Sequence, residues 1–277
     1  MDEIVIQKIV LAMISHVAES SLPVFLEGPD GQPREAGSGT LFEIAGHYFL
    51  ATAAHVIKNY PLRSIVLSPF RQPSNYSPPL TGYGWRGGEK GDPLDIAWIE
   101  LEPRAAVQTQ NHFLSIENFE VGTTHAPDEM AFVHGYPVER IEKDERDGET
   151  AYLSSGIGYV TGTLSVSAVE TRFSPNPTID VFLTCLKTRI TTRLKDGCAA
   201  LQTLLGISGG GIWRVRNNRG IWMPSHSRMI AIENSWVRGA WLRSTQAQHW
   251  LRMLVEDVPA VGGPISDMFP AILEVAS

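Results

Sequence analysis

The stretch "LLGISGGGIW", from Leu204 to Trp213, places Ser208 among four glycines and then continues directly into apolar residues. A flexible linker would not be followed by apolar residues such as Trp213 and Val215. A buried strand would not contain so much glycine, because glycine loses backbone entropy on folding and contributes no side-chain packing. The stretch therefore predicts a turn around Ser208 that needs unusual backbone freedom.

The glycine two positions before the serine suggests what such a turn can do. Gly206 lets the backbone bend sharply, so that the N–H groups of Gly206 and Ser208 can point at the same place. Two such donors stabilise the negative oxygen that develops during acyl transfer. The glycines after Ser208 leave space for a substrate to approach the hydroxyl. Alone, the motif is also compatible with a glycine-rich turn that has no chemistry.

A serine hydroxyl is a poor nucleophile unless a base removes its proton. Of the eight histidines, His55 stands apart because it follows an apolar strand and two small residues. Asp95 comes immediately before the apolar strand 96–101, so a rigid element would position its carboxylate to orient an imidazole; we prefer it to Asp92 in the preceding loop. Taken singly, a satisfied histidine and a turn-capping aspartate are the ordinary explanations.

Composition limits the classes of protein that the chain can belong to. Of the 277 residues, 43% are hydrophobic and 19% are charged, as in a globular protein with a sizeable core. The formal net charge is −7 and no block of five or more Lys/Arg residues occurs, whereas nucleic acid binding needs a basic surface. Nucleic acid is therefore not an expected partner.

Short apolar runs punctuated by Gly, Pro, Asn and Asp are typical of strands, and they occur here in two comparable sets. A polar, turn-rich stretch at 120–128 separates the sets. The first set is "LPVFLEG", "GSGTLFEI", "HYFLATAAHVI", "RSIVLSPF" and "LDIAWIEL"; the second is "EMAFVHGYP", "GIGYVTGTLSV", "TIDVFLTCL", "GGGIWRV" and "RMIAIEN". The expected fold is all-β, with two packed antiparallel β-barrels and no alternation of strands with helices.

Helical spacing of apolar residues predicts an amphipathic helix over 3–18 and a second helix over 244–258, with Pro259 just beyond its end. The first helix is expected to pack its apolar face on the body; the alternative is a docking site for a regulatory protein partner. The expected organisation is an N-terminal helix (1–20), barrel one (about 21–125), barrel two (about 126–243), a terminal helix (244–258) and a tail (259–277).

The cysteines and the first residues bear on the cellular compartment. Cys185 and Cys198 are the only cysteines, and two reduced, buried thiols are expected; a single disulfide is the alternative. Asp2 and Glu3 lead the chain and Lys8 interrupts its first apolar run, unlike a secretory signal. No run approaches the roughly 20 apolar residues of a membrane span. The expectation is a soluble, cytoplasmic protein without a membrane partner.

Three segments in chain order now carry a resemblance. "TAAHV" around His55, "DIAWIEL" from Asp95 and "GISGGG" around Ser208 resemble the histidine, aspartate and G-x-S-G-G motifs of the trypsin/chymotrypsin-like serine peptidases. The resemblance covers roughly residues 22–258. It implies a serine endopeptidase of chymotrypsin-like fold that acts on proteins or peptides, with no cofactor and no metal.

In that family these residues have known roles, and the reaction proceeds through a covalent acyl-enzyme. The resemblance implies that Ser208 is the nucleophile, that His55 moves its proton, and that Asp95 orients the imidazole. The N–H groups of Gly206 and Ser208 would form the oxyanion hole. Val56 stands where many extracellular relatives have a disulfide cysteine, and Ile207 where zymogen-derived enzymes have an aspartate. These departures resemble intracellular bacterial-type members.

Specificity is harder to predict. The family's primary pocket has its base six residues before the serine, at Gln202, which argues against a preference for Lys or Arg. Glu233 and Asn234 are candidates for the pocket edge, and Asp196 is an alternative carboxylate. No residue preference follows from these positions.

The sequence also bears on other classes of protein. An α/β-hydrolase would need a helix directly after the serine, and "GGGIWRV" is a poor helix. No metal or nucleotide motif supports those classes of site. The serious alternative is a trypsin-like fold that is catalytically silent and acts as a binding or sensor module.

Overall fold

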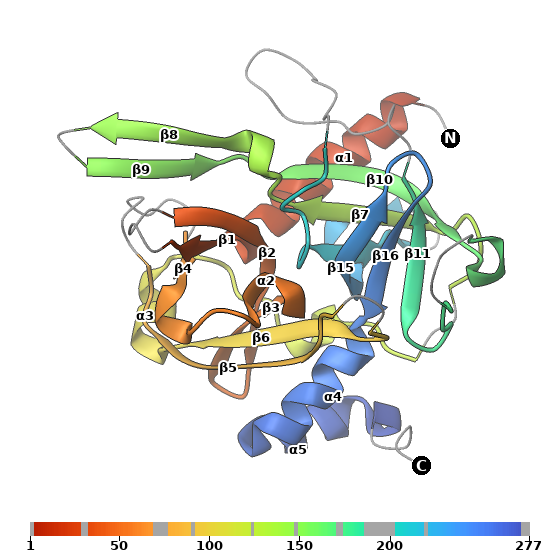
Figure 1. The fold of residues 1–277 in the computed structure, drawn as a ribbon. Helices are drawn as coiled ribbons and strands as arrows, with labels where there is room; N and C mark the ends of the chain where they lie inside the picture. Colours follow the sequence, from red (N-terminus) through yellow and green to blue (C-terminus); the bar gives the residue numbers. More distant parts are fainter. Residues whose placement is uncertain are drawn as a thin grey trace.

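A computed structural model describes residues 3–28, 33–68, 77–89, 92–122, 125–146, 149–169, 174–185, 203–218 and 221–272. Two six-stranded antiparallel β units lie side by side and make up the body (Figure 1). The expected two-barrel, all-β architecture with helices at both ends is confirmed. The second unit is a closed barrel, whereas the first is a sheet with β4 and β5 at its edges.

The first unit has the strand order β4-β1-β2-β3-β6-β5. Alternate residues of its first strand, Leu22, Val24 and Leu26, belong to one buried core cluster, as expected for side chains that alternate between the two faces of a strand. The strands are β1 (Ser21–Glu27), β2 (Pro33–Ile44), β3 (His47–Thr52), β4 (Ile65–Leu67), β5 (Leu80–Gly87) and β6 (Asp95–Leu101).

The second unit closes in the order β10-β11-β16-β15-β12-β7. Its interior is a separate core cluster that includes Val133, Tyr159 and Leu183. The strands are β7 (Met130–Gly135), β10 (Ile157–Leu164), β11 (Asp180–Thr184), β12 (Gly211–Arg214), β15 (Arg228–Val237) and β16 (Trp241–Gln246).

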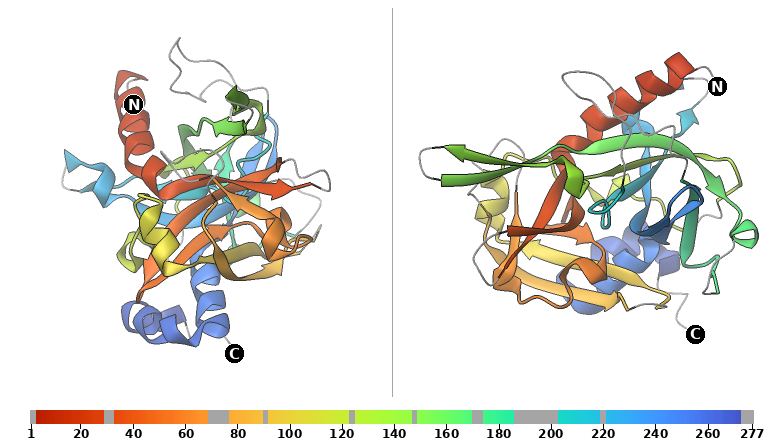
Figure 2. Two further views of the ribbon diagram at one scale, coloured as in Figure 1. Left: turned by 90° about the vertical axis from the view of Figure 1, so that its left-hand side faces the viewer. Right: turned by 45° about the horizontal axis from the view of Figure 1, so that its top comes forward.

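Two small hairpins lie outside the main sheets. β8 (Ile141–Arg146) and β9 (Glu149–Ser154) form a ribbon that projects from the body, as Figures 1 and 2 show. β13 (Asn217–Asn218) pairs with β14 (Ile221–Trp222). The described 3₁₀ segments are η1 (Ala18–Ser20), η2 (Leu62–Ser64), η3 (Ile116–Asn118), η4 (Val138–Arg140), η5 (Val166–Ala168), η6 (Pro224–His226) and η7 (Pro270–Ile272).

The terminal helices lie at opposite ends of the molecule (Figure 2). α1 (Glu3–Val17) buries Met13 and Val17 against the second unit, while Val5 and Leu11 remain exposed. Its apolar face therefore packs on the body, as expected. No helix in the described part of the chain is long and apolar enough to cross a membrane.

The C-terminal helices fasten the second unit to the first. α4 (Ala247–Asp257) follows the last strand of the barrel, and Trp250 donates its indole N–H to the Ala97 carbonyl of β6 at 2.8 Å. At the other end of α4, Asp257 accepts from the indole of Trp98 at 2.9 Å. The remaining helices are α2 (Ala54–Ile57), α3 (Pro103–Gln108) and α5 (Pro259–Met268).

The prediction of a helix over 244–258 is wrong at its start. Ser244, Thr245 and Gln246 end β16, where Ser244 pairs with Glu233 of β15, and the helix begins at Ala247. Pairing inside the closed barrel outweighs the local preference of these polar residues for a helix N-terminus. Pro259 does not merely end a helix: it starts α5, at a position where its fixed φ suits the first turn.

Candidate active site

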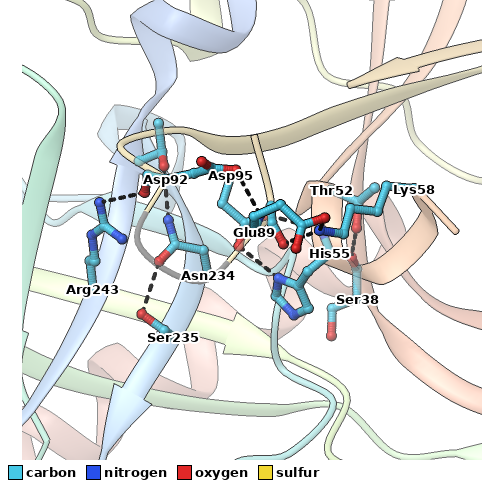
Figure 3. Close-up of polar contacts among 12 residues, drawn as sticks. Ser38, Thr52, His55, Lys58, Glu89, Asp92, Asp95, Asn234, Ser235 and Arg243 are labelled. Carbon is cyan, nitrogen blue, oxygen red and sulfur yellow. Dashed lines mark hydrogen bonds and ion pairs between the residues drawn. The ribbon is translucent and has the colours of Figure 1, made fainter. Parts of the chain in front are cut away.

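His55 and Asp95 meet at the edge of the first unit. β3 ends at Thr52 and the single turn α2 presents the histidine, while Asp95 is the first residue of β6. The Asp95 carboxylate lies 2.7 Å from Nδ1 of His55 and accepts the backbone N–H of the same residue at 2.9 Å (Figure 3). The carboxylate thus orients the ring and favours the proton on Nδ1, which leaves Nε2 for a reacting group.

The turn that carries Ser208 is pressed against the segment leading to His55. Gly206 and Gly209 have φ angles of +93° and +89°, which favour glycine. A Cβ on Gly209 would lie 2.1 Å from the carbonyl oxygen of Ser38 and 2.2 Å from Oγ1 of Thr52. The glycines that stand out in the sequence are therefore required by a close approach between the two units.

Ser38 of β2 holds this turn in place. Its N–H donates to the carbonyl of Ser208 at 2.7 Å, and its hydroxyl donates to the carbonyl of Gly206 at 2.7 Å. The same hydroxyl accepts the N–H of Tyr136 at 2.8 Å, and Thr52 donates to the Ser38 carbonyl at 2.7 Å. The buried Ser38 therefore joins both units to the turn that carries Ser208. Its sequence context did not indicate this role.

The amides of the turn divide into two groups. The N–H groups of Ile207, Gly209 and Gly210 donate to backbone carbonyls, at 3.2, 2.8 and 2.8 Å. Among the described residues, those of Gly206 and Ser208 donate no hydrogen bond. The two amides expected to bind an oxyanion are thus the two that the fold leaves unused.

The structure brings His55 and Asp95 together but does not complete a hydrogen-bonded chain from Ser208 through His55 to Asp95. No hydrogen bond joins His55 to Ser208, both of which are described. The side chain of Glu233 on β15 is buried next to the Ser208 turn, and its carboxyl oxygens have no hydrogen-bond partner.

Glu233 is fully buried, and its backbone forms hydrogen bonds with the turn that carries Ser208. Its carbonyl accepts the N–H of Gly209 at 2.8 Å, and its N–H donates to the carbonyl of Gly210 at 2.9 Å. Neither carboxyl oxygen makes a hydrogen bond of standard geometry. Burial raises the pKa of Glu233 to about 8; interaction with the Ser208 hydroxyl opposes this rise, and the charge of Asp95 adds to it.

The other two candidates for the pocket differ from Glu233. Asn234 is buried and donates to the hydroxyl of Thr245 at 2.8 Å, while Ser235 donates to its side-chain oxygen at 3.2 Å. Its amide is thus engaged by the strand β16 and by its neighbour. Gln202, and the alternative carboxylate Asp196, lie outside the described residues.

The loop before Asp95 is held from both units. On one side, Lys58 pairs with Glu89 at 2.6 Å and donates to the carbonyl of Gly88 (Figure 3). On the other, Arg243 of β16 donates to the carbonyl of Pro93 at 3.0 Å while its Nε binds the buried Asp180 at 2.7 Å. No signal in the local sequence indicates Arg243, because its partners Asp180 and Pro93 lie far away along the chain.

The remaining groups that could bind a metal or react are clusters of metal ligands and the thiols. No group of three or more His, Cys, Asp or Glu side chains suited to a metal ion occurs in the described part of the chain. Cys185 is a free, buried thiol, and burial raises its pKa. Cys198 lies outside the described residues.

Comparison with known proteins identifies the fold and nothing finer. No protein-family model matches the chain, and no curated protein matches it. Among solved structures, human heparin binding protein is similar, with a TM-score of 0.50 and 13% identity over 86% of this chain and 92% of that chain. A likeness at this identity concerns architecture alone. Together with the two six-stranded antiparallel units, it shows that this chain has the chymotrypsin-like fold.

Proposed function

We propose that the protein is a serine endopeptidase. Oγ of Ser208 attacks the carbonyl carbon of a peptide bond, and Nε2 of His55 takes its proton and passes it to the departing amine. Water then cleaves the resulting ester by the same route, with His55 again acting as base. Asp95 stabilises the imidazolium that forms in each step. The unused amides of Gly206 and Ser208 bind the developing oxyanion.

One observation carries this proposal. His55, which the carboxylate of Asp95 orients, lies beside the glycine-rich turn of the other unit that carries Ser208. Two hydrogen bonds from Asp95 hold His55, at 2.7 and 2.9 Å. The Ser208 turn is anchored to β2, next to the segment that leads to His55, by the bond from Ser38 to the Ser208 carbonyl.

The test is covalent labelling with a fluorophosphonate probe, followed by profiling of a peptide library. Wild-type protein is expected to be labelled, and Ser208→Ala is expected to be unlabelled and inactive. Ser167→Ala, a change at an exposed serine, is the matched control and should behave as wild type. Labelling that survives in Ser208→Ala at the wild-type rate would contradict the proposal.

A binding or sensor module is the second candidate. The missing hydrogen bond between His55 and Ser208 favours it, because an arrangement without that contact does not activate the hydroxyl. The same experiment separates the two: a folded wild-type chain that stays unlabelled between pH 6 and 9 is a module and not a peptidase.

Three further predictions accompany the peptidase function. The substrate is a protein or peptide, the location is cytoplasmic as in intracellular bacterial-type relatives, and α1 binds a regulatory protein partner. The exposed Val5 and Leu11 on α1 are the residues to replace in a test of that partner. Fractionation of cells that express the chain tests the location.

A further inference from the structure

Two ionisable side chains bear on the hydroxyl of Ser208. Nε2 of His55 must accept the hydroxyl proton if Ser208 is to act as a nucleophile. The second side chain is Glu233, whose buried carboxyl has no hydrogen-bond partner and whose pKa is influenced by the Ser208 hydroxyl. Which of the two receives the proton depends on whether Glu233 is itself neutral or charged.

The backbone of Glu233 leaves its side chain little choice of neighbour. Hydrogen bonds of 2.8 and 2.9 Å tie Glu233 to Gly209 and Gly210, the two residues after the nucleophile. The side chain is completely buried, and its pKa responds to the Ser208 hydroxyl. The two backbone bonds and the full burial make its position next to the Ser208 turn a built feature of the fold.

Among the residues that the structure describes, no cation pairs with Glu233. Asp95 on β6 acts on it as a like charge, and the buried hydroxyl of Tyr159 on β10 and the thiol of Cys185 interact with it unfavourably. Ser244 faces it from β16. Arg243, the arginine of that strand, pairs with Asp180 instead.

A buried carboxyl in this position is costly, because an unpaired charge loses its hydration and gains nothing in return. Both oxygens of Glu233 lack a standard hydrogen bond, as do the hydroxyls of Tyr159 and Ser244. An apolar residue would stabilise the barrel interior better. Perturbed, unpaired carboxyls of this kind occur preferentially at functional sites.

We propose that Glu233 is a positioning residue for Ser208, a step that rests on the peptidase function proposed above. As a neutral carboxyl it donates its proton to Oγ of Ser208 and leaves the serine hydrogen for His55. As a carboxylate it can only accept, so it takes the serine hydrogen for itself and withdraws the hydroxyl from His55. No bond other than these hydrogen bonds changes.

The direction of the pH effect follows. Because burial raises the pKa of Glu233 to about 8, the productive neutral form dominates at pH 7 and is lost above pH 8. A single ionisation with that midpoint predicts a loss of about thirty-fold in reactivity between pH 7 and pH 9.5.

The main experiment measures the rate of fluorophosphonate labelling from pH 5 to 10. Wild type is expected to show the alkaline loss. Glu233→Gln keeps a neutral donor at every pH, so the loss disappears while the acid side of the profile is unchanged. Glu233→Ala also has no alkaline loss but reacts more slowly throughout. Glu117→Gln, at an exposed glutamate, is the charge-matched control and retains the wild-type profile.

A measurement without turnover separates this inference from the peptidase proposal. Carbon-13 NMR of glutamate carboxyls in the intact chain should show one resonance with a midpoint near 8, absent from Glu233→Gln. Because the Ser208 hydroxyl favours the charged form, Ser208→Ala should raise that midpoint further. This readout does not require Glu233→Gln to be active.

The outcomes are distinct. If wild type is labelled and Glu233→Gln retains the alkaline loss, the positioning role is overturned and the peptidase function stands. A Glu233 midpoint that is ordinary, or that Ser208→Ala leaves unchanged, overturns the contact itself. If no variant is labelled at any pH, the peptidase function fails and the positioning role fails with it.

Discussion

At Asp95 both carboxylate oxygens are used: one lies against Nδ1 of His55 and the other accepts the histidine N–H. At Glu233 neither oxygen has a hydrogen-bond partner. Burial without a partner raises the pKa of Glu233, so its surroundings and not its own chemistry set its behaviour. Roles at this site are set by neighbours that are far away in the chain.

At the same scale, the catalytic residues are expected to act as a unit. His55→Ala and Ser208→Ala should each remove nearly all turnover, and the double variant should be little worse than either, because neither side chain accelerates the reaction without the other. Kinetics of peptide hydrolysis by the three variants test this. Losses that multiply would contradict a shared mechanism.

Ser38→Ala tests whether the Ser38 hydroxyl holds the turn that carries Ser208 in place. The change leaves the carbonyl of Gly206 and the N–H of Tyr136 without their buried partner. Each unsatisfied group costs about 1–3 kcal/mol, so the free energy of unfolding should fall by at least that amount. Labelling of Ser208 should slow as well. Urea denaturation and labelling rates measure the two effects, and unchanged values for both would contradict the anchoring role.

The Ser208 turn is the element on which the two units meet. Its conformation depends on positive φ angles at Gly206 and Gly209, and its position depends on contacts with β2, β3 and β15. A turn of this kind has little stability of its own. It is held by strands on both sides, which allows a serine on a glycine-rich segment to be placed accurately.

Gly209→Ala and Gly239→Ala separate strain from collision. Both glycines have positive φ, at +89° and +75°, but a Cβ meets backbone and side-chain oxygens near 2 Å at Gly209 and nothing within 4 Å at Gly239. Gly239→Ala should cost about 1–2 kcal/mol of backbone strain alone. Gly209→Ala should lose several times more stability and all labelling. Thermal unfolding of the two variants gives the comparison, and equal losses would contradict the close approach.

In the molecule as a whole, burial shifts the pKa values of different ionisable groups in opposite directions. His134 in β7 is fully buried, and burial lowers its pKa to about 4. His125 accepts a hydrogen bond from Arg214 at 2.8 Å, and burial together with that cation lowers its pKa to about 4. Glu233 is shifted the other way. The packed units therefore favour three neutral groups at once.

The two histidines predict acid destabilisation. Their stabilising contribution is complete above the ordinary histidine pKa of 6.5 and is lost as pH falls from there towards 4, because the unfolded chain binds protons first. The urea midpoint should therefore fall between pH 6.5 and 4. His134→Gln should flatten part of that fall. A midpoint that is constant over this range would contradict the burial of both rings.

The buried carboxyl of Glu233 predicts the opposite pH dependence, a stability that falls as pH rises. Its folded pKa of about 8 exceeds the ordinary 4.5, so its contribution is complete below pH 4.5 and is lost as pH rises towards 8. Glu233→Gln should therefore be more stable than wild type at pH 8, and the difference should shrink towards pH 5. Urea denaturation at the two pH values tests this. A constant difference would mean that the carboxyl is not neutral when buried.

Much of the architecture follows from local pattern alone. Apolar alternation indicates most strands of both units, and helical spacing places the first helix close to its observed bounds, Glu3–Val17. β5, β8, β9 and β16 were not among the predicted runs. β16 reads "WLRSTQ" and is buried throughout, so no alternation marks it as a strand. Its neighbours in the closed barrel, and not its own residues, make it one.

The candidate site also has some residues that local sequence predicts and others that only the tertiary structure identifies. His55, Asp95 and Ser208 could be proposed from one-dimensional information because each is flanked by residues that a strand end or a sharp turn requires within a few positions. Ser38, Arg243 and the role of Glu233 could not. The bond from Ser38 to Gly206 spans 168 residues and that from Arg243 to Asp180 spans 63. Side-chain hydrogen bonds act over about 3 Å in space, so partners this distant along the chain become known only when the barrel closes and the units pack.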